Sequence, residues 1–281
     1  MRKSFAKQEA PLLIGVVREE KVRTAIAAIR NCEYHGATGI DLHLSTLNPE
    51  AQTVEAMKQI IDACRLPMLA LNYSNRYDGS IYEDDEESRV ELLMRSVEAG
   101  VACVDFQGYT FDRPSKNGFR QEFAHLGYSF IKNNPKEIVV NPAVIERQME
   151  LFERVHKAGA EVLLSTHPGV NMNCEQVVEL AHFLAKRNPD VIKIVAPVNN
   201  DEELAECIRT QLVLKKEFEN SPIRVHYHGC NKAGSLTRLL NPLLGGYLIF
   251  CNDGYSESSN FDQLDLQTAK NVLDGLKKIM M

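Results

Sequence analysis

The most constraining feature of the sequence is an alternation of two kinds of segment that occurs eight times along its 281 residues. Short runs of β-branched and aliphatic residues have the length of strands, and they cover residues 12–17, 39–44, 67–73, 102–107, 161–166, 191–196, 223–228 and 247–252. Longer amphipathic stretches have the spacing of helices, and they cover residues 19–35, 49–64, 84–99, 142–158, 173–187, 200–218, 233–241 and 265–279. Strands that alternate with helices build parallel sheets, because each helix returns the chain to the start of the next strand. Eight βα units in succession therefore predict a (β/α)8 barrel, the TIM-barrel fold.

The connections between the predicted elements are short, except in the fourth unit. Glycine or proline ends several of the helical stretches just before a strand, as in "HGATG" and "RNPD". Residues 109–141 separate the fourth strand from its helix, whereas connections in compact domains usually have about 2 to 6 residues. We therefore predict a single barrel domain over residues 1–281, with 109–141 as an insertion that is either functional or an added subdomain.

Composition and charge limit the partners of such a barrel. The net charge is −6 and the Lys and Arg residues are scattered, which argues against nucleic acid or an anionic membrane as a partner. No stretch reaches the ~20 consecutive apolar residues of a membrane span, and the basic N-terminus has too short an apolar run for a signal peptide. The seven cysteines are widely spaced without a CxxC pair, which is typical of reduced thiols rather than of disulfides or zinc. We expect a cytoplasmic protein that acts on a small molecule.

The stretch "NPDVIKIVAP" places Lys193 in the sixth predicted strand, among valines and isoleucines. Both faces of a barrel strand are covered, so this ammonium group is expected to be shielded from bulk water. Burial lowers the pKa of a lysine, and a neutral amine is a nucleophile for carbonyl groups. The alternative is that Lys193 extends along the strand to solvent, or pairs with a carboxylate such as Asp41 or Asp105.

His167 follows the fifth predicted strand, in "EVLLSTHPG". An imidazole titrates near pH 6.5 and can take up and return a proton within one turnover, as the chemistry of an imine requires. Loop histidines without a catalytic role are common. However, His167 and Lys193 lie at neighbouring strand ends, where barrels carry their active sites, and this combination favours a functional interpretation.

The segments after the seventh and eighth predicted strands have the character of ligand-binding loops. "KAGSLTRLLNPLLGG" contains Arg238, whose planar fork suits a carboxylate, although a helix arginine is often only a solvated surface charge. The run at 252–263 is rich in Ser, Asn and Gly, and it is interpreted as a polar lid or as an ordinary loop. Anions often bind in this region of a barrel.

Four motifs in this order resemble those of the type I 3-dehydroquinate dehydratases, a family of Schiff-base barrels. "STHPG" is similar to the family's histidine motif after strand five, and "VIKIVAP" to its lysine motif on strand six. "KAGSLTR" resembles its K-x-G-x-x-S-R segment, and "SNFDQ" resembles its S-A-P-G-Q lid. The resemblance extends from "LIGVV" to the last predicted helix, so it covers nearly the whole chain.

The resemblance implies a role for each of these positions. Lys193 would form an imine with the substrate ketone, and His167 would remove a proton from the neighbouring carbon and return one to the departing hydroxyl. Arg238 would hold the ring carboxylate, with help from Ser259 and Gln263. The reaction would be loss of water from 3-dehydroquinate or a close analogue, a step of the shikimate pathway. The family resemblance also implies a homodimer that uses no cofactor and no metal.

The sequence departs from the family pattern at positions that would contact the substrate or orient the catalytic histidine. The family's E-x-R on strand two is replaced by Asp41 and His43, and its strand-three arginine appears as Tyr73, with Arg76 as a nearby substitute. The carboxylate expected to orient the catalytic histidine from strand four falls at Gln107, which can hydrogen-bond an imidazole but brings no charge. We therefore expect the covalent chemistry to be retained and the turnover of 3-dehydroquinate to be slow or absent.

Two other classes of function also fit the pattern. Asp41 and His43 share one face of strand two, His226 and His228 share one face of strand seven, and His167 lies between them, which is enough to ligate zinc or iron in a metal-dependent barrel enzyme. Such pairs also arise from packing inside a barrel. The third interpretation is a non-catalytic barrel that binds a metabolite, which the altered substrate-reading positions suit.

Overall fold

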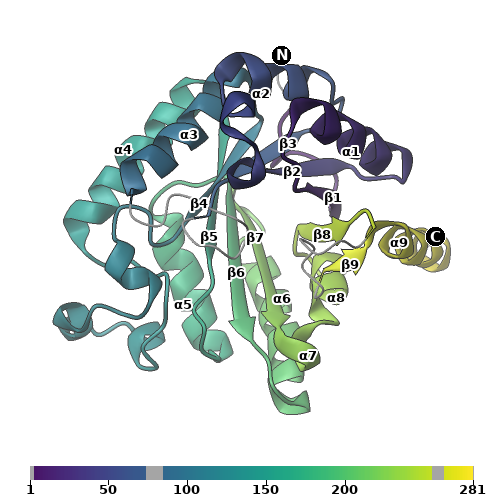
Figure 1. The fold of residues 1–281 in the computed structure, drawn as a ribbon. Helices are drawn as coiled ribbons and strands as arrows, with labels where there is room; N and C mark the ends of the chain where they lie inside the picture. Colours follow the sequence, from purple (N-terminus) through teal and green to yellow (C-terminus); the bar gives the residue numbers. More distant parts are fainter. Residues whose placement is uncertain (1–2, 74–84, 255–262, 281) are drawn as a thin grey trace. The chain divides into compact units, whose positions relative to one another are not determined.

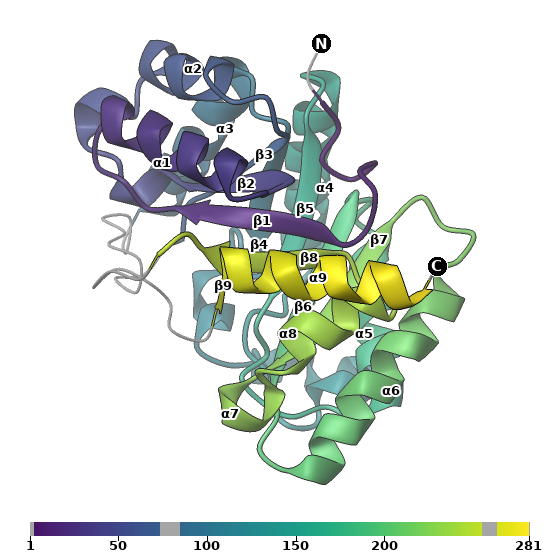
Figure 2. The same ribbon diagram turned by 90° about the vertical axis from the view of Figure 1, so that its right-hand side faces the viewer.

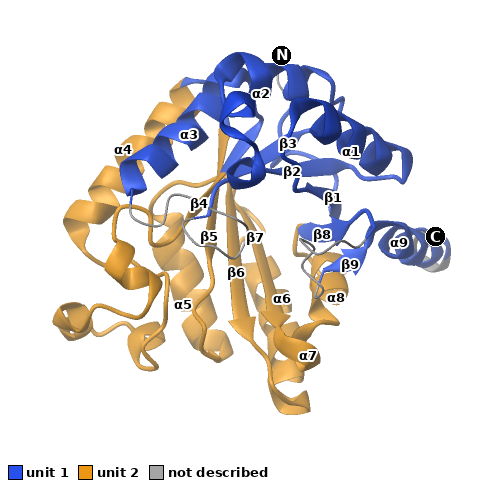
Figure 3. Cartoon of the chain, in the orientation of Figure 1, with its two compact units in different colours: residues 1–104, 158–160, 248–281 blue, residues 105–157, 161–247 orange. Residues whose placement is uncertain are grey.

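The computed structural model describes residues 3–73, 85–254 and 263–280. The chain divides into two compact units, which are coloured separately in Figure 3. Unit 1 consists of residues 1–104, 158–160 and 248–281. Unit 2 consists of residues 105–157 and 161–247, so that the division falls inside β4 (Cys103–Gln107). The single barrel domain expected over residues 1–281 stays a prediction.

Unit 1 contains the first three βα units and the C-terminal segment (Figure 1). Its elements are β1 (Leu12–Val17), α1 (Val22–Tyr34), β2 (Gly39–His43), η1 (Leu44–Thr46), η2 (Pro49–Ala51), α2 (Val54–Asp62), β3 (Met68–Leu71), α3 (Glu86–Ala99), β8 (Leu248–Asn252), β9 (Leu264–Asp265) and α9 (Leu266–Met280). The strands are parallel in the order β3-β2-β1-β8-β9. Figure 2 shows α9 running alongside β1 and β8.

The strands β1, β2, β3 and β8 of unit 1 are covered on both faces, and every residue in them is buried. Most of these residues are apolar, and the buried polar exceptions are Asp41 and His43 of β2 and Asn252 of β8. The helices stop at defined positions. For example, α3 ends before Gly100, whose φ of +109° is a left-handed conformation that glycine adopts without steric cost.

Unit 2 contains the remaining βα units (Figure 1). Its elements are η4 (Arg113–Lys116), η5 (Gln121–Leu126), η6 (Ser129–Ile131), α4 (Pro142–Lys157), β5 (Glu161–Thr166), α5 (Cys174–Ala185), β6 (Val191–Pro197), α6 (Asp201–Glu217), β7 (Arg224–Cys230), α7 (Asn231–Gly234) and α8 (Thr237–Leu243). The strands β5, β6 and β7 are parallel neighbours in that order. Their carboxyl ends are therefore adjacent, as a βα active site requires.

The structure confirms the predicted alternation, corrects one helix, and adds short elements that were not predicted. The insertion at 109–141 contains the three short helices η4, η5 and η6. They were not predicted, because this segment has no long amphipathic period. The single helix predicted at 233–241 is instead two short helices, α7 and α8. The two-residue strand β9 was not predicted, because two residues are too few to form a pattern. Within the described ranges, no helix is both long and apolar enough to cross a membrane.

Candidate active site

Lys193 lies in a row of polar side chains that crosses unit 2 at one level. The strand register pairs Ser165 of β5 with Lys193 of β6, and Lys193 with His226 of β7, so the three side chains share one face. Asp105 of β4 joins them, since its Oδ1 accepts a 2.6 Å hydrogen bond from Ser165 Oγ and its Oδ2 lies 4.0 Å from Lys193 Nζ. Lys193 is only 7% exposed, which confirms the predicted burial. Asp105 provides the negative charge that a buried ammonium group requires.

His167 lies one level nearer to the carboxyl ends of the strands, two residues beyond Ser165. Its Nδ1 donates a 2.9 Å hydrogen bond to Oε2 of Glu137, and its backbone N–H donates to the same oxygen at 2.9 Å. Since a carboxylate oxygen is an acceptor, the proton of the neutral imidazole is on Nδ1 and the lone pair is on Nε2. His167 thus has the tautomer and the fixed ring orientation of a general base.

Glu137 reaches His167 because the end of the insertion runs beside the loop after β5. Lys136 N–H donates to Pro168 O at 2.7 Å, and Thr166 Oγ1 donates to Glu137 O at 3.2 Å. Gly108, the residue after β4, makes this approach sterically feasible. A Cβ at Gly108 would lie 2.0 Å from Glu137 O, a distance that no packing tolerates. The insertion therefore delivers a carboxylate to the site.

This carboxylate is the functional residue that the sequence analysis missed. We expected the imidazole partner on strand four at Gln107, without a charge. In the structure the charged partner comes from the insertion, and the Gln107 side chain donates a 3.3 Å hydrogen bond to Asp105 O. The length of residues 109–141 was the only signal in the sequence, and it did not single out Glu137.

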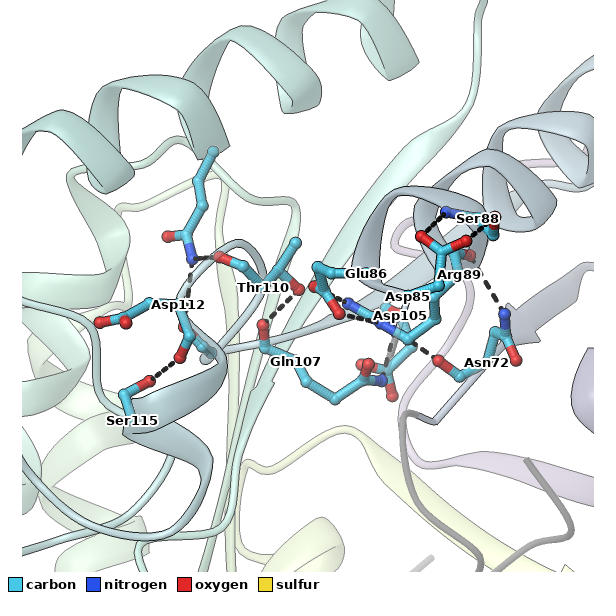
Figure 4. Close-up of polar contacts among 12 residues, drawn as sticks. Asn72, Asp85, Glu86, Ser88, Arg89, Asp105, Gln107, Thr110, Asp112 and Ser115 are labelled. Carbon is cyan, nitrogen blue, oxygen red and sulfur yellow. Dashed lines mark hydrogen bonds and ion pairs between the residues drawn. The ribbon is translucent and has the colours of Figure 1, made fainter. Parts of the chain in front are cut away.

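The base of the insertion is held by hydrogen bonds to main-chain oxygens. Thr110 Oγ1 donates to Gln107 O at 2.7 Å, and Ser115 Oγ donates to Asp112 O at 2.8 Å (Figure 4). The buried Gln148 of α4 donates from Nε2 to Thr110 O at 2.7 Å. These bonds satisfy main-chain oxygens of a chain segment that has no sheet or long helix.

Two histidines on β7 form a second polar feature of the site. His226 lies beside Lys193 in the register, and His228 lies two residues further on, on the same face. His226 Nε2 and His228 Nδ1 are 2.9 Å apart, and Tyr247 N–H donates to His226 Nδ1 at 3.3 Å. Both histidines are buried. Imidazoles in such surroundings are neutral hydrogen-bonding groups.

Burial and nearby positive charges both lower the pKa values of this pair. Burial lowers the pKa of His226 to about 3, with further lowering by the positive charges of Lys193 and Arg238. Burial also holds the pKa of His228 well below its usual range, and the positive charges of Arg238 and Lys193 lower it further. Two residues predicted for the site, Lys193 and Arg238, thus influence both imidazoles.

Arg238 is placed by a close contact between two backbone segments. Gly229 at the end of β7 and Gly234 at the end of α7 approach so closely that a Cβ on either one would lie within 3.0 Å of the other's backbone. Thr237 bridges them, since its Oγ1 accepts from Gly229 N–H at 2.7 Å and donates to Gly234 O at 2.6 Å. This contact separates α7 from α8 and fixes the start of α8, where Arg238 lies.

The other predicted substrate contacts belong to unit 1 or lie outside the described residues. Asp41 and His43 form a buried pair on β2, with Asp41 Oδ2 3.3 Å from His43 Nε2. Tyr73 follows the end of β3, and Gln263 precedes β9. Ser259 and Arg76 lie outside the described residues.

A buried arginine of α3 holds the chain just after the end of β3. Arg89 of α3 is fully buried, and its Nη1 donates to Asn72 O at 2.8 Å while Glu86 accepts from its Nε and Nη2 (Figure 4). Asn72 Nδ2 donates back to Arg89 O at 3.1 Å. Tyr73 therefore leaves β3 from a defined position.

Among the residues that the structure describes, no three His, Cys, Asp or Glu side chains are arranged to hold a metal ion. His226 and His228 point ring nitrogens at each other, and His43 points one at Asp41.

Comparison with solved structures identifies the fold class of this chain. Over 99% of this chain and 97% of the other, the structure superposes on the 3-dehydroquinate dehydratase of Geobacillus kaustophilus with a TM-score of 0.72 at 14% identity. Over 96% and 94%, it superposes on the type I enzyme of Clostridium difficile, solved with covalently modified comenic acid, with a TM-score of 0.71 at 13% identity. The chain thus has an α/β-barrel fold with a curled parallel sheet, as predicted.

The family follows from the sequence. The family model of type I 3-dehydroquinase matches residues 16–280, and the chain belongs to this family. A 3-dehydroquinate dehydratase of Coxiella burnetii is 29% identical over 128 residues, which cover 44% of this chain and 52% of that protein. Another, from Alkaliphilus oremlandii, is 23% identical over 129 residues. In these alignments the chain spans about half the length of the curated relatives it matches.

Proposed function

We propose that this protein is a Schiff-base lyase that removes water from a cyclic hydroxy-keto carboxylic acid, 3-dehydroquinate or a close analogue. The observation that carries the proposal is the buried Lys193 beside Asp105, one level below an imidazole whose tautomer a carboxylate fixes. Membership of the type I 3-dehydroquinase family supports the same chemistry. The covalent ligand of the Clostridium difficile relative also agrees with it.

The chemistry assigns one role to each group. The ammonium group of Lys193 first gives up a proton, and the neutral amine adds to the ketone carbon. The carbinolamine hydroxyl then takes up a proton and leaves as water, which forms a protonated imine. His167 Nε2 removes a proton from the neighbouring carbon, whose electron pair enters the enamine. The hydroxyl on the next carbon then leaves as water with a proton returned by His167. A second water hydrolyses the imine and releases Lys193 with the enone acid.

Glu137 and Asp105 support these two groups without contacting the bond that breaks. Glu137 holds His167 in the Nδ1–H tautomer and stabilises the imidazolium that forms when Nε2 takes the proton. Asp105 compensates the positive charge of Lys193 before the reaction and that of the protonated imine during it. Arg238 holds the carboxylate of the substrate. The non-catalytic interpretation is less well supported, because it leaves this arrangement unused.

Borohydride trapping tests the proposal directly. Reduction of the imine converts it to a stable secondary amine, so incubation with 3-dehydroquinate and borohydride is expected to add the mass of the reduced ligand to the peptide that contains Lys193. Lys193→Met is the control and should remain unlabelled. A wild-type protein that stays unlabelled with 3-dehydroquinate and with a panel of cyclic hydroxy-keto acids would overturn the proposal.

The buried pair of Asp41 and His43 suggests a substrate that differs from 3-dehydroquinate in its other hydroxyl groups. The pair replaces a charged E-x-R segment, and losing one ionic contact typically costs about 1.5 to 3 kcal/mol, or roughly 10- to 100-fold in rate. We therefore propose slow turnover of 3-dehydroquinate. A rate in steady-state assays that matches that of a family relative measured alongside would contradict this.

We also propose that the protein works as a homodimer in the cytoplasm. All seven cysteines are free thiols, which suits a reducing compartment. The dimer follows from the family resemblance, and light scattering on the purified protein measures it.

A further inference from the structure

The two histidines of β7 form a hydrogen-bonded chain with a defined direction. Because Tyr247 N–H is a donor, His226 Nδ1 accepts and the proton of the neutral ring is on His226 Nε2. That proton is donated to His228 Nδ1, 2.9 Å away. His228 therefore carries its own proton on Nε2. A backbone amide thus sets the tautomers of both rings.

The chain ends in a donor that lacks an acceptor. His228 Nε2 is buried, and it has no hydrogen-bond partner among the residues that the structure describes. His228 as a whole is only 2% exposed, so bulk water does not compensate. A buried N–H group without a partner is unfavourable and therefore rare in folded proteins. A bound ligand is one source of the missing acceptor.

The surroundings indicate which ligand atom this donor meets. His228 lies on the same strand face as His226, whose register partner is Lys193. The charge of Arg238 is the largest single electrostatic influence on its ring. A neutral N–H and a guanidinium in the same neighbourhood suit an anionic acceptor with several lone pairs, and a carboxylate has about four.

We propose that His228 Nε2–H donates a hydrogen bond to the substrate carboxylate that Arg238 holds, and so helps to select a carboxylic acid as substrate. This inference rests on the proposed function and extends it to a residue that the sequence analysis considered only as a metal ligand or as packing. His226 is a positioning residue, since it acts by keeping the proton of His228 on Nε2.

Two substitutions of His228 separate the donor from the shape of the side chain. His228→Met removes the donor and keeps an apolar side chain of similar reach, and it should raise KM for 3-dehydroquinate about 10- to 100-fold, as expected for a lost hydrogen bond to a charged group. His228→Gln places an amide N–H near the same position and should keep KM within about threefold. The melting temperature of His228→Met should stay close to that of the wild type, because the substitution removes one unpartnered donor, His228 Nε2–H, and leaves another, His226 Nε2–H.

A measurement on the unsubstituted protein provides an independent test. In ¹⁵N spectra of histidine-labelled protein, His228 should be the Nε2–H tautomer, and its Nε2 signal should shift when 3-dehydroquinate binds. A proton on Nδ1, an unchanged signal at saturating ligand, or a folded His228→Met variant with the wild-type KM would overturn the inference. If Lys193 cannot be trapped but the Nε2 signal still shifts, the proposed lyase function fails and the carboxylate contact of His228 stands.

Discussion

At the scale of single residues, Glu137 combines an unfavourable backbone with a useful side chain. Its φ is +58°, in the left-handed region, where the other non-glycine residues of the described chain are Phe111 and three asparagines. Asparagine tolerates this region, whereas for most residues it costs about 1 to 2 kcal/mol. Strain of this kind commonly accompanies function. Here it places one carboxylate oxygen against two donors of His167.

Two substitutions at this position should separate strain from function. Glu137→Gln removes the charge and keeps the strain, whereas Glu137→Gly removes both. Both should lower kcat by about 100-fold or more with little change in KM, because the imidazolium loses its counter-charge. Glu137→Gly should exceed Glu137→Gln in free energy of unfolding by about 1 kcal/mol, measured by urea denaturation. Equal stabilities would show that the backbone is not strained.

At the scale of elements, the insertion depends on the glycine after β4. Gly108→Ala would place a Cβ 2.0 Å from Glu137 O, so the segment that carries Glu137 must move away. We expect kcat to fall as far as in Glu137→Gln, while borohydride still labels Lys193. Steady-state kinetics and peptide mass analysis measure the two effects. Wild-type kcat in Gly108→Ala would mean that Glu137 does not tune His167.

The histidines of β7 make the stability of the protein depend on pH. The folded pKa of His226 is lowered to about 3 and that of His228 is lowered as well, so below the unfolded value of about 6.5 the unfolded chain binds protons that the folded chain does not. The free energy of unfolding should therefore fall as the pH is lowered below about 6.5, by about 1.4 kcal/mol per pH unit for each histidine that stays neutral in the folded protein. Urea denaturation from pH 8 to pH 4 should show a smaller slope in His228→Met than in wild type. Parallel slopes would contradict this.

Candidate site residues at the carboxyl ends of strands were easier to predict than those in the long connecting segment. Lys193 and His167 were accessible from sequence because strand period and element order fix the level and face of a residue. Arg238 was predicted from a motif whose glycine has a steric cause, the contact of Gly234 with Gly229. Glu137 was not accessible, because it belongs to a segment without periodicity whose path depends on long-range contacts.

At the scale of the whole molecule, the alternation of apolar runs predicted the fold because each run is buried on both faces. The direction of the β7 histidine chain could not be predicted, since it depends on Tyr247 N–H, 19 and 21 positions away from the two rings. The division into two compact units was also absent from the sequence pattern. It falls inside β4, where the alternation shows no interruption.

The thiols provide a prediction about the molecule as a whole. None of the seven cysteines forms a disulfide, and burial raises the pKa of Cys32 to about 12 and that of Cys207 to about 11. Since the thiolate is the reactive form, these two should be alkylated at pH 8 about 100-fold or more slowly than in urea. Peptide mass analysis after timed iodoacetamide exposure measures this. Rapid labelling of either in the native protein would indicate opening of the core.

The first donor of the histidine chain on β7 is a main-chain amide, and this determines how the chain responds to substitutions at position 247. Any residue except proline at position 247 supplies the same N–H, so natural variation there leaves the polarity of the chain unchanged. Which ring nitrogen of His228 carries the proton therefore depends on the path of the backbone and not on a neighbouring side chain. Reversing it would require moving a strand rather than exchanging a side chain.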